Sequence, residues 1–225
     1  MIENLTSEGK CIYCNEVFSQ KEITKHITGH LKKSEKDKGG ANTENFCHIE
    51  IEAGEMFLHL LVKGSAKMKD IDTFLRKIWL DCCGHMSGFS HKRAKVSMSH
   101  AVENVFAAKV KIQHDYDYGT TTTVFLKGHK KYELEGKDKI VLLSRNEPLK
   151  IMCSICNAKP ASCLCTVCLW EESSFFCESC TEKHEEICED FSDYANAPIV
   201  NSPRMGECGY DGGVIDKDRD GCFAN

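Results

Sequence analysis

Hydrophobic and polar positions follow two different periods in the middle of the chain, which predicts both strands and a helix there. Residues 56–62 (MFLHLLV) form an apolar run of strand length. Residues 70–83 place apolar side chains three and four positions apart, and Gly84 follows where such a helix would end. Three further ranges are alternating or rich in β-branched residues and are expected to be strands: 109–116, 120–126 and 139–143. We therefore expect residues 46–150 to form one mixed domain of helices and strands.

The hydrophobic period is lost on both sides of this domain. Residues 32–45 (KKSEKDKGGANTEN) are polar and contain glycine, which predicts a flexible linker. A small unit precedes the linker, and a cysteine-rich segment follows the domain. The sequence thus divides into five segments: a small N-terminal unit 8–31, the linker 32–45, the domain 46–150, a cysteine-rich module 151–190 and a tail 191–225.

Eight cysteine and histidine residues recur at regular spacing in the cysteine-rich module. They form three Cys-x2-Cys pairs and one His-x3-Cys pair: Cys153 and Cys156, Cys165 and Cys168, Cys177 and Cys180, and His184 and Cys188. Two intervening residues let one short turn aim both sulfur atoms at a single ion, and eight ligands suffice for two closed tetrahedral zinc sites. A segment of fewer than 40 residues cannot build an adequate apolar core. Metal binding is therefore expected to supply most of its folding free energy.

The N-terminal unit carries a second zinc motif. Cys11 and Cys14 are followed, after eleven residues, by His26 and His30 on a helix expected over residues 20–30. A helix brings side chains four positions apart onto one face, so both imidazoles can reach one ion. The unit resembles CCHH zinc fingers in its ligands, although the usual gap between the two pairs is twelve residues. A third zinc ion is expected here.

The fifteen cysteines point to metal binding in a reducing compartment rather than to disulfides. Residues 1–10 have neither the basic start nor the apolar stretch of a signal peptide. No apolar run approaches the roughly 20 residues that span a bilayer. Cys-x2-Cys pairs in such a chain favour metal sites, which predicts a cytoplasmic protein, or a nuclear one in a eukaryote, with no membrane contact.

Charge is unevenly distributed along the chain. Residues 1–45 carry no net charge, residues 46–150 carry +4, and residues 151–225 carry −9. Binding to phosphates depends on positive charge, so the last third is better suited to a protein partner than to nucleic acid. Four lysines in or beside the finger are the candidates for nucleic-acid contact: Lys21, Lys25, Lys32 and Lys33.

The middle domain also contains polar residues that invite a functional interpretation. Cys82, Cys83 and His85 lie together at the end of the expected helix. Because cysteine often packs as a small apolar side chain, burial explains them more simply than a metal site or a catalytic pair. Cys208, in the tail, is either an unassigned thiol or a replacement ligand for the cysteine-rich module.

Residues 56–127 resemble a family of uncharacterised proteins encoded on plasmids and insertion elements, the plasmid open-reading-frame-three-like or transposon-passenger proteins. Three stretches carry the resemblance: residues 56–80, Gly84–Phe89 and Asp115–Gly119. The acidic residue and tryptophan that usually follow the last stretch are replaced by Thr120–Thr123. The resemblance implies a fold and an association with mobile DNA, but no activity.

Residues 153–188 resemble MYND-type and related cross-brace zinc fingers. The resemblance implies interleaved sites, in which the first and third pairs hold one ion and the second and fourth pairs hold the other. The third pair has two intervening residues where MYND fingers have three, so sequential pairing remains an alternative. Fingers of this kind bind short peptide motifs, which implies a protein partner, and Trp170, Phe175 and Phe176 are candidates to line the groove.

The sequence as a whole predicts an α+β protein, with a central mixed α/β domain flanked by two small zinc-stabilised modules. We expect a non-enzymatic zinc-binding adaptor with three zinc ions, which binds a protein partner and has a candidate nucleic-acid surface in its N-terminal half. Two alternatives remain. One is a mobile-element-associated nucleic-acid-binding protein, and the other is an enzyme with a middle-domain pocket around His59, His85 and Asp115.

Overall fold

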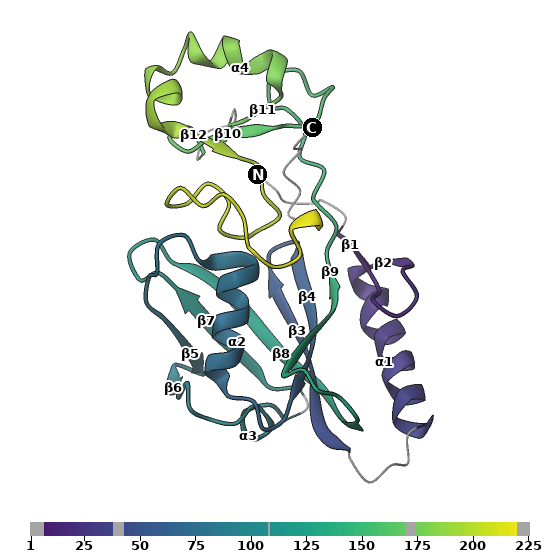
Figure 1. Cartoon of the computed structure of the whole chain (residues 1–225). Coiled ribbons are helices and arrows are strands. Elements are labelled where there is room, and N and C mark those ends of the chain that lie inside the picture. The colour runs from purple at the N-terminus through teal and green to yellow at the C-terminus, as the bar shows by residue number, and fades with distance from the viewer. Residues whose placement is uncertain (1–6, 38–42, 108, 170–173, 220–225) are drawn as a thin grey trace. The chain divides into compact units, whose positions relative to one another are not determined.

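The computed structural model describes residues 7–37, 43–107, 109–169 and 174–219 (Figure 1). The chain forms two compact units. Of the described residues, the sheet unit contains those within 7–75 and 85–147, and the cysteine-rich unit contains those within 76–84 and 148–219. Helices and antiparallel strands occur in both, so the predicted α+β class is confirmed.

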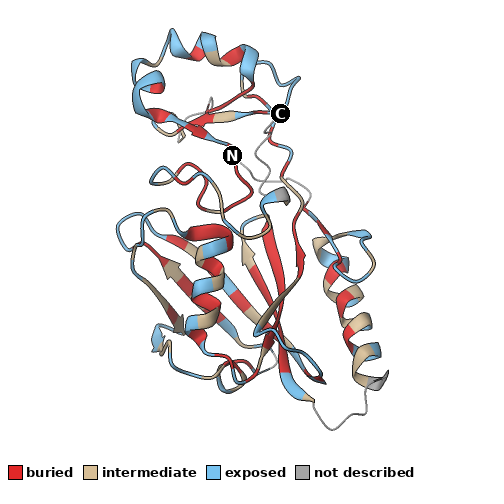
Figure 2. Ribbon diagram, in the orientation of Figure 1, coloured by how far each residue is buried: buried red, intermediate tan, exposed pale blue. Residues whose placement is uncertain are grey.

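Seven antiparallel strands form the main sheet of the sheet unit. Their order is β6-β5-β7-β8-β3-β4-β9. The bounds are β3 Glu44–Ala53, β4 Met56–Lys63, β5 Ser87–His91, β6 Ala94–Val96, β7 Lys111–Tyr116, β8 Thr122–Leu134 and β9 Ile140–Arg145. Helix α2 (Met68–Leu75) lies across one face of the sheet, and the short α3 (Val102–Val105) lies near one end (Figure 1). Figure 2 shows the buried residues running along the central strands.

The predicted strands are present with shifted ends, and one central strand was missed. β4 covers its expected range, whereas β7, β8 and β9 begin one or two residues later than expected, and β8 continues to Leu134. β3 was not predicted, and its first residues fall in the expected linker. Its sequence alternates Ile49 and Ile51 with Glu50 and Glu52, which is the period of a strand.

The helix expected over residues 70–83 is shorter and changes geometry. It begins at Met68, ends as an α-helix at Leu75 and continues as the π-helical turn η1 (Arg76–Leu80). The amide of Asp81 donates to the carbonyl of Arg76 at 2.9 Å, five residues back. The wider turn accompanies the burial of three successive side chains, Ile78 to Leu80. Gly84, with φ at +80°, follows as expected for the end of the helix.

The N-terminal finger belongs to the sheet unit and is not followed at once by a linker. β1 (Glu8–Lys10) pairs with β2 (Val17–Ser19), and α1 runs over Gln20–Asp37, past the predicted end at His30. Ile23, Ile27 and Leu31 are fully buried in one cluster with side chains of the sheet. This apolar stripe explains why the finger packs as part of the larger unit. Of the predicted linker, residues 32–37 are helical, 38–42 lie outside the described residues, and 44–45 begin β3.

Two glycines of the finger allow a matched test of this packing. A Cβ on Gly9 would lie 2.6 Å from the buried Phe57 ring and 2.8 Å from Ser144 Oγ, whereas a Cβ on Gly29 would meet nothing within 4 Å. We expect Gly9→Ala to lower the free energy of unfolding by about 1–3 kcal/mol through overpacking. Gly29→Ala should raise it by about 0.5–1 kcal/mol, because glycine is costly inside a helix. Urea denaturation of the two variants measures both changes, and a Gly9→Ala protein as stable as wild type would contradict the packing.

The cysteine-rich unit is built around a small sheet in the order β11-β10-β12. Its elements are η1, β10 Cys163–Cys165, β11 Phe175–Phe176, α4 Glu178–Glu185, η2 Phe191–Ala195, β12 Asn196–Pro198 and η3 Lys217–Arg219. The tail expected from residue 191 onward is largely folded: β12 pairs with β10, and Ser202 Oγ donates to the carbonyl of Trp79 at 2.6 Å. Val214 N donates to the carbonyl of Lys77 at 2.7 Å. Residues 199–219 thus pack against the 76–84 segment of their own unit.

Candidate metal centres

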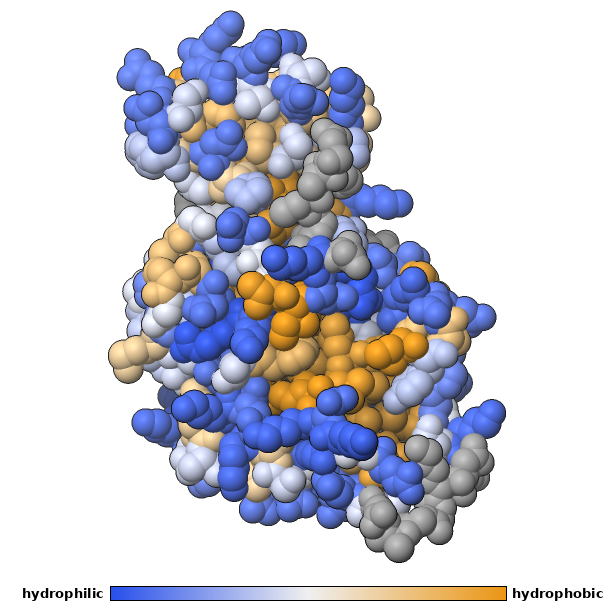
Figure 3. All heavy atoms as spheres, viewed as in Figure 1, coloured by the Kyte–Doolittle hydropathy of each residue, from blue (hydrophilic) through white to orange (hydrophobic). Residues whose placement is uncertain are grey.

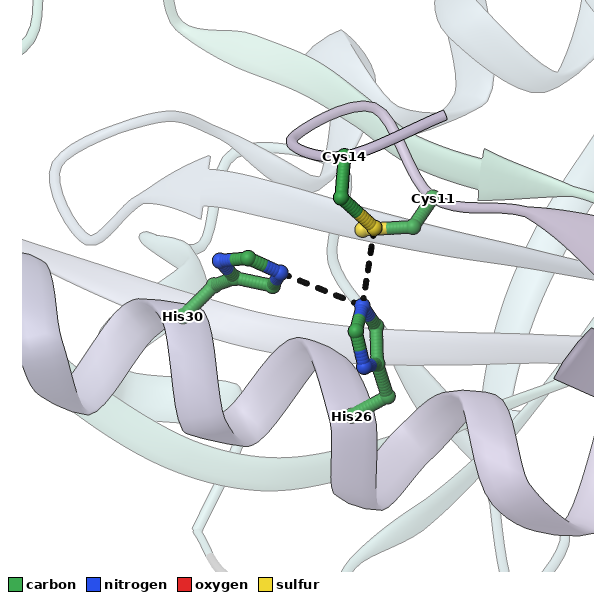
Figure 4. Close-up of side chains that lie close together, drawn as sticks. All are labelled: Cys11, Cys14, His26 and His30. Carbon is green, nitrogen blue, oxygen red and sulfur yellow. Dashed lines mark hydrogen bonds between the residues drawn. The ribbon is translucent and has the colours of Figure 1, made fainter. Parts of the chain in front are cut away.

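The finger brings its four predicted ligands together. Cys11 and Cys14 lie in the turn between β1 and β2, and His26 and His30 lie one turn apart on α1 (Figure 4). Cys14 Sγ lies 3.2 Å from His26 Nε2, which lies 3.1 Å from His30 Nε2. One ligand atom from each of the four residues lies within 4.8 Å of the other three. The arrangement is compatible with one metal ion.

The surroundings of His26 favour its neutral imidazole. Burial lowers the pKa of His26 below its usual value, and the neighbouring His30 adds to the shift. The His26 ring stacks on Phe18 and the His30 ring on Tyr13, with ring centroids 3.9 Å and 5.0 Å apart. A metal-binding imidazole must be neutral, so the burial of His26 suits that role.

The cysteine-rich unit contains two further groups, and their members alternate along the chain. The first group contains the first and third pairs, Cys153, Cys156, Cys177 and Cys180. The second contains the second and fourth pairs, Cys165, Cys168, His184 and Cys188. This is the interleaved arrangement implied by the MYND resemblance, and the sequential alternative does not match it.

The contacts inside these two groups follow from the local fold. Cys177 immediately precedes α4, which carries Cys180 on its first turn and His184 on its last. Cys156 Sγ lies 3.8 Å from Cys177 Sγ, and Cys165 Sγ lies 3.9 Å from Cys188 Sγ. The His184 ring is buried and stacks on Phe176, with centroids 4.1 Å apart. Phe175 and Phe176 are therefore buried supports of the groups rather than the lining of an open groove, and Trp170 lies outside the described residues.

The thiols of these groups differ in how readily they lose a proton. The Ser179 hydroxyl lowers the pKa of Cys177 to about 6. Burial, together with neighbouring thiols, raises the pKa of Cys168 and of Cys180 to about 12. Since a metal binds the thiolate, an ion entering these groups must displace protons.

Two further cysteines, Cys163 and Cys47, lie outside these three groups. Cys163, two residues before Cys165, has its Sγ 3.5 Å from Thr181 Oγ1 and 3.7 Å from the carbonyl oxygen of Phe176. Cys47 is buried in β3. Among the described residues no cysteine is in a disulfide.

Three cysteines outside the predicted zinc groups also come together. The sulfur atoms of Cys82, Cys83 and Cys208 lie within 4.8 Å of one another, and His85 follows two residues after Cys83. Cys83 and Cys208 are exposed and Cys82 is half-buried. The expectation that the two neighbouring cysteines pack as core side chains is therefore wrong, and these thiols form part of a fourth group compatible with a metal ion.

The four candidate nucleic-acid lysines are all exposed. They lie along α1: Lys21, Lys25, Lys32 and Lys33. None of them belongs to the apolar stripe that packs against the sheet. Their side chains are available to a partner.

A buried histidine network on the sheet was missed by the sequence interpretation. His48 Nε2 on β3 lies 3.1 Å from His59 Nδ1 on β4, and His129 Nε2 on β8 lies 2.7 Å from Glu50 Oε2 on β3. His48 and His59 are fully buried. The alternation of residues 46–52 could have placed His48 and Glu50 on one face of a strand.

The residues proposed for an enzymatic pocket do not share one set of contacts. His59 belongs to the histidine network, whereas His85 Nε2 lies 3.5 Å from Asp117 Oδ2. Asp115 accepts hydrogen bonds from Gln113 and Thr123. A cavity of about 340 Å³ beside the network is lined by Cys47, His48, Phe106, Ala107, Gly128, His129, Lys130 and Lys131. The three proposed residues are not in that lining.

No protein-family model and no curated protein matches the chain. Among solved structures, a protein of unknown function from Methanosarcina mazei Go1 matches with a TM-score of 0.39 and 13% identity, over 44% of this chain and 67% of that protein. A similarity this distant indicates neither a fold nor a function, so the family resemblances expected from the sequence stay predictions. Among the described residues, no helix has the length and apolar character needed to cross a membrane.

Proposed function

We propose that the chain is a non-enzymatic zinc protein that serves as an adaptor for a protein partner, with one zinc ion in each of the three predicted groups. The observation that carries the proposal is that each group supplies four cysteine or histidine ligands. Zinc sites closed by four protein ligands are structural, whereas catalytic zinc sites keep a position for water or substrate. The proposed role of the metals is therefore to hold the interaction surfaces in shape.

The distances within the groups support zinc. A tetrahedral ion with bonds of about 2.3 Å to sulfur has sulfur–sulfur edges of about 3.8 Å. The sulfur pairs of the cysteine-rich unit lie at 3.8 Å and 3.9 Å. Mixed and nitrogen–nitrogen edges should be about 3.5 Å and 3.4 Å, and the finger distances of 3.2 Å and 3.1 Å lie about 0.3 Å below these.

The surface of the cysteine-rich unit favours a protein partner with basic and apolar side chains. Ile187 and Tyr194 are 80% and 69% exposed. The segment that carries them contains five exposed acidic residues: Glu185, Glu186, Glu189, Asp190 and Asp193. Large apolar side chains surrounded by charge are typical of recognition sites. In the sheet unit, Figure 3 shows a second gathering of hydrophobic residues over β4 and β9, where Ile140 to Leu142 are half-buried.

Nucleic-acid binding by the N-terminal half is the second candidate. The exposed lysines of α1 support it, because phosphate contacts come from such side chains. A single finger covers about 3 bp, so sequence-specific reading by the finger alone would be weak. Salt-dependent retention of the intact chain on DNA or RNA, reduced by Lys21→Gln with Lys25→Gln, would favour this candidate over the adaptor.

A binding experiment on the zinc-loaded chain tests the adaptor proposal. The partner is captured from the native host, after nuclease treatment, and its affinity for the purified chain is then measured. We expect Ile187→Ser with Tyr194→Ser to weaken binding at least about tenfold, because exposed apolar anchors carry much of an interface's energy.

Met86→Ser is the matched control, since Met86 is 75% exposed in the sheet unit. This variant should bind like wild type. Equal affinity of the double variant and wild type would overturn the proposed surface, and capture that disappears with nuclease would overturn the adaptor role.

A further inference from the structure

We infer that Cys82, Cys83 and Cys208 form a fourth zinc site, which fixes the folded tail to the end of η1. Cys82 Sγ lies 3.8 Å from Cys83 Sγ, and Cys83 Sγ lies 3.6 Å from Cys208 Sγ. These spacings are close to the sulfur–sulfur edge of about 3.8 Å in a tetrahedral zinc–thiolate site. The thiols come from positions 125 residues apart in sequence, so their meeting is a product of the fold and not of a short motif.

A buried arginine lies beside the thiols, and its positive charge favours a negatively charged sulfur at this position. Arg204 is fully buried, and its Nη2 lies 3.7 Å from Cys82 Sγ. A buried guanidinium requires anionic or strongly polar partners, and a zinc-bound thiolate accepts hydrogen bonds from such a donor. The contact therefore fits a metal-bound sulfur better than a neutral thiol.

Two left-handed turns present the cysteines. Gly84 has a φ of +80°, and its amide donates to Asp81 Oδ1 at 3.0 Å, which closes the turn around the two adjacent cysteines. Cys208 itself has a φ of +51° and precedes Gly209 at +64°. A positive φ is costly for cysteine, and such strain persists where the surrounding structure holds it in place.

The three thiols would fill three of the four tetrahedral positions of a zinc ion, and they all come from the cysteine-rich unit. A water molecule can complete the coordination of such an ion.

The proposed site would stabilise the folded tail, and its zinc ion should be removed more easily than the other three. It would join the chain around Cys208 to the 82–83 turn, in addition to the backbone contact of Val214 with Lys77. Cys83 and Cys208 are exposed, whereas each of the other three groups has at least one fully or nearly fully buried cysteine. We therefore expect this zinc ion to be the first one that a chelator removes.

The test is the zinc content of the purified full chain, measured by mass spectrometry of the metal. Wild type should hold four zinc ions, and Cys83→Ser with Cys208→Ser should hold three. In the double variant, trypsin should cleave after Arg204 faster than in wild type, because Arg204 is buried only while the tail is packed. Cys163→Ser is the matched control and should retain four ions, since Cys163 lies outside every group.

Three results would overturn the inference: three ions in wild type, four ions in the double variant, or a Cys83–Cys208 disulfide in the purified chain. The three ions that remain in the double variant report that the rest of the chain is folded. Fewer than three ions in wild type would instead contradict the proposed zinc adaptor, so the two failures are distinguishable.

Discussion

Cys165→Ser is expected to unfold the small sheet and α4 of the cysteine-rich unit while leaving the seven-stranded sheet intact. The apolar clusters around the two groups are very small. One consists of Cys165, Phe176, Phe191 and Ala195, and the other contains only ligand cysteines. A structural zinc ion supplies about 10 kcal/mol or more of binding free energy, whereas one buried apolar side chain supplies about 1.5–3 kcal/mol. Loss of one ligand therefore removes the largest source of stability.

Amide hydrogen exchange measured by mass spectrometry resolves the two units. We expect protection to be lost in residues 162–188 of the variant and retained in residues 44–63. Cys163→Ser serves as the matched control, because Cys163 is two residues away, half-buried and outside the ligand groups. Unchanged protection of α4 in Cys165→Ser, or an equal loss in both units, would contradict metal-dependent folding of this unit.

Short-range patterns predicted the cysteine and histidine pairs that the structure groups together, because the spacing within each pair is local. Two residues between cysteines, and three between histidines, set the geometry within a turn of chain, so Cys11 with Cys14 and His26 with His30 could be paired on sequence alone. The partner of each pair depends on the fold. Spacing left both pairings of the cysteine-rich module open, and the interleaved one follows from α4 carrying Cys180 and His184 to different groups.

Long-range contacts explain what the sequence interpretation missed. Residues 32–37 lack an apolar period but remain helical, and Glu35 accepts hydrogen bonds from Lys130 Nζ and from the amide of Glu133. The fourth thiol group joins residues 82 and 208, and no local pattern links positions so far apart. By contrast, the sequence of β3 contains a local signal. Ile49 and Ile51 alternate with Glu50 and Glu52, and this two-residue period predicts a strand.

Acid is expected to destabilise the sheet unit through its buried histidines. Burial, with a smaller contribution from His59 and His129, lowers the pKa of His48 to about 2. Burial also lowers the pKa of His59 to about 4, against the opposing effect of Glu50. In the unfolded chain both groups titrate near 6.5. Between pH 6.5 and pH 5 the unfolded state therefore binds protons that the folded state does not, and the free energy of unfolding falls as the pH falls.

The expected loss is about 2 kcal/mol per histidine between pH 7 and pH 5, or about 4 kcal/mol for the pair. Burial raises the pKa of Glu50, but the hydrogen bond from His129, the charges of His59 and His129 and the hydrogen bond from Lys127 together lower it to about 2. Glu50 therefore adds a loss of the same sign only below about pH 4.5. The finger would also release its metal in acid. A variant that removes the two histidines separates these effects, because metal release is common to both proteins.

His48→Leu with His59→Leu is the appropriate comparison. Replacing both partners of a buried hydrogen bond with apolar side chains costs little, so the variant should fold. Its urea midpoint, followed by hydrogen exchange over residues 44–63, should fall less than that of wild type between pH 7 and pH 5, by the equivalent of about 4 kcal/mol. The exposed His100 provides the control, since His100→Gln should keep the full wild-type dependence on pH. If wild type and the double variant lose the same stability in acid, the two histidines are not buried in their neutral form.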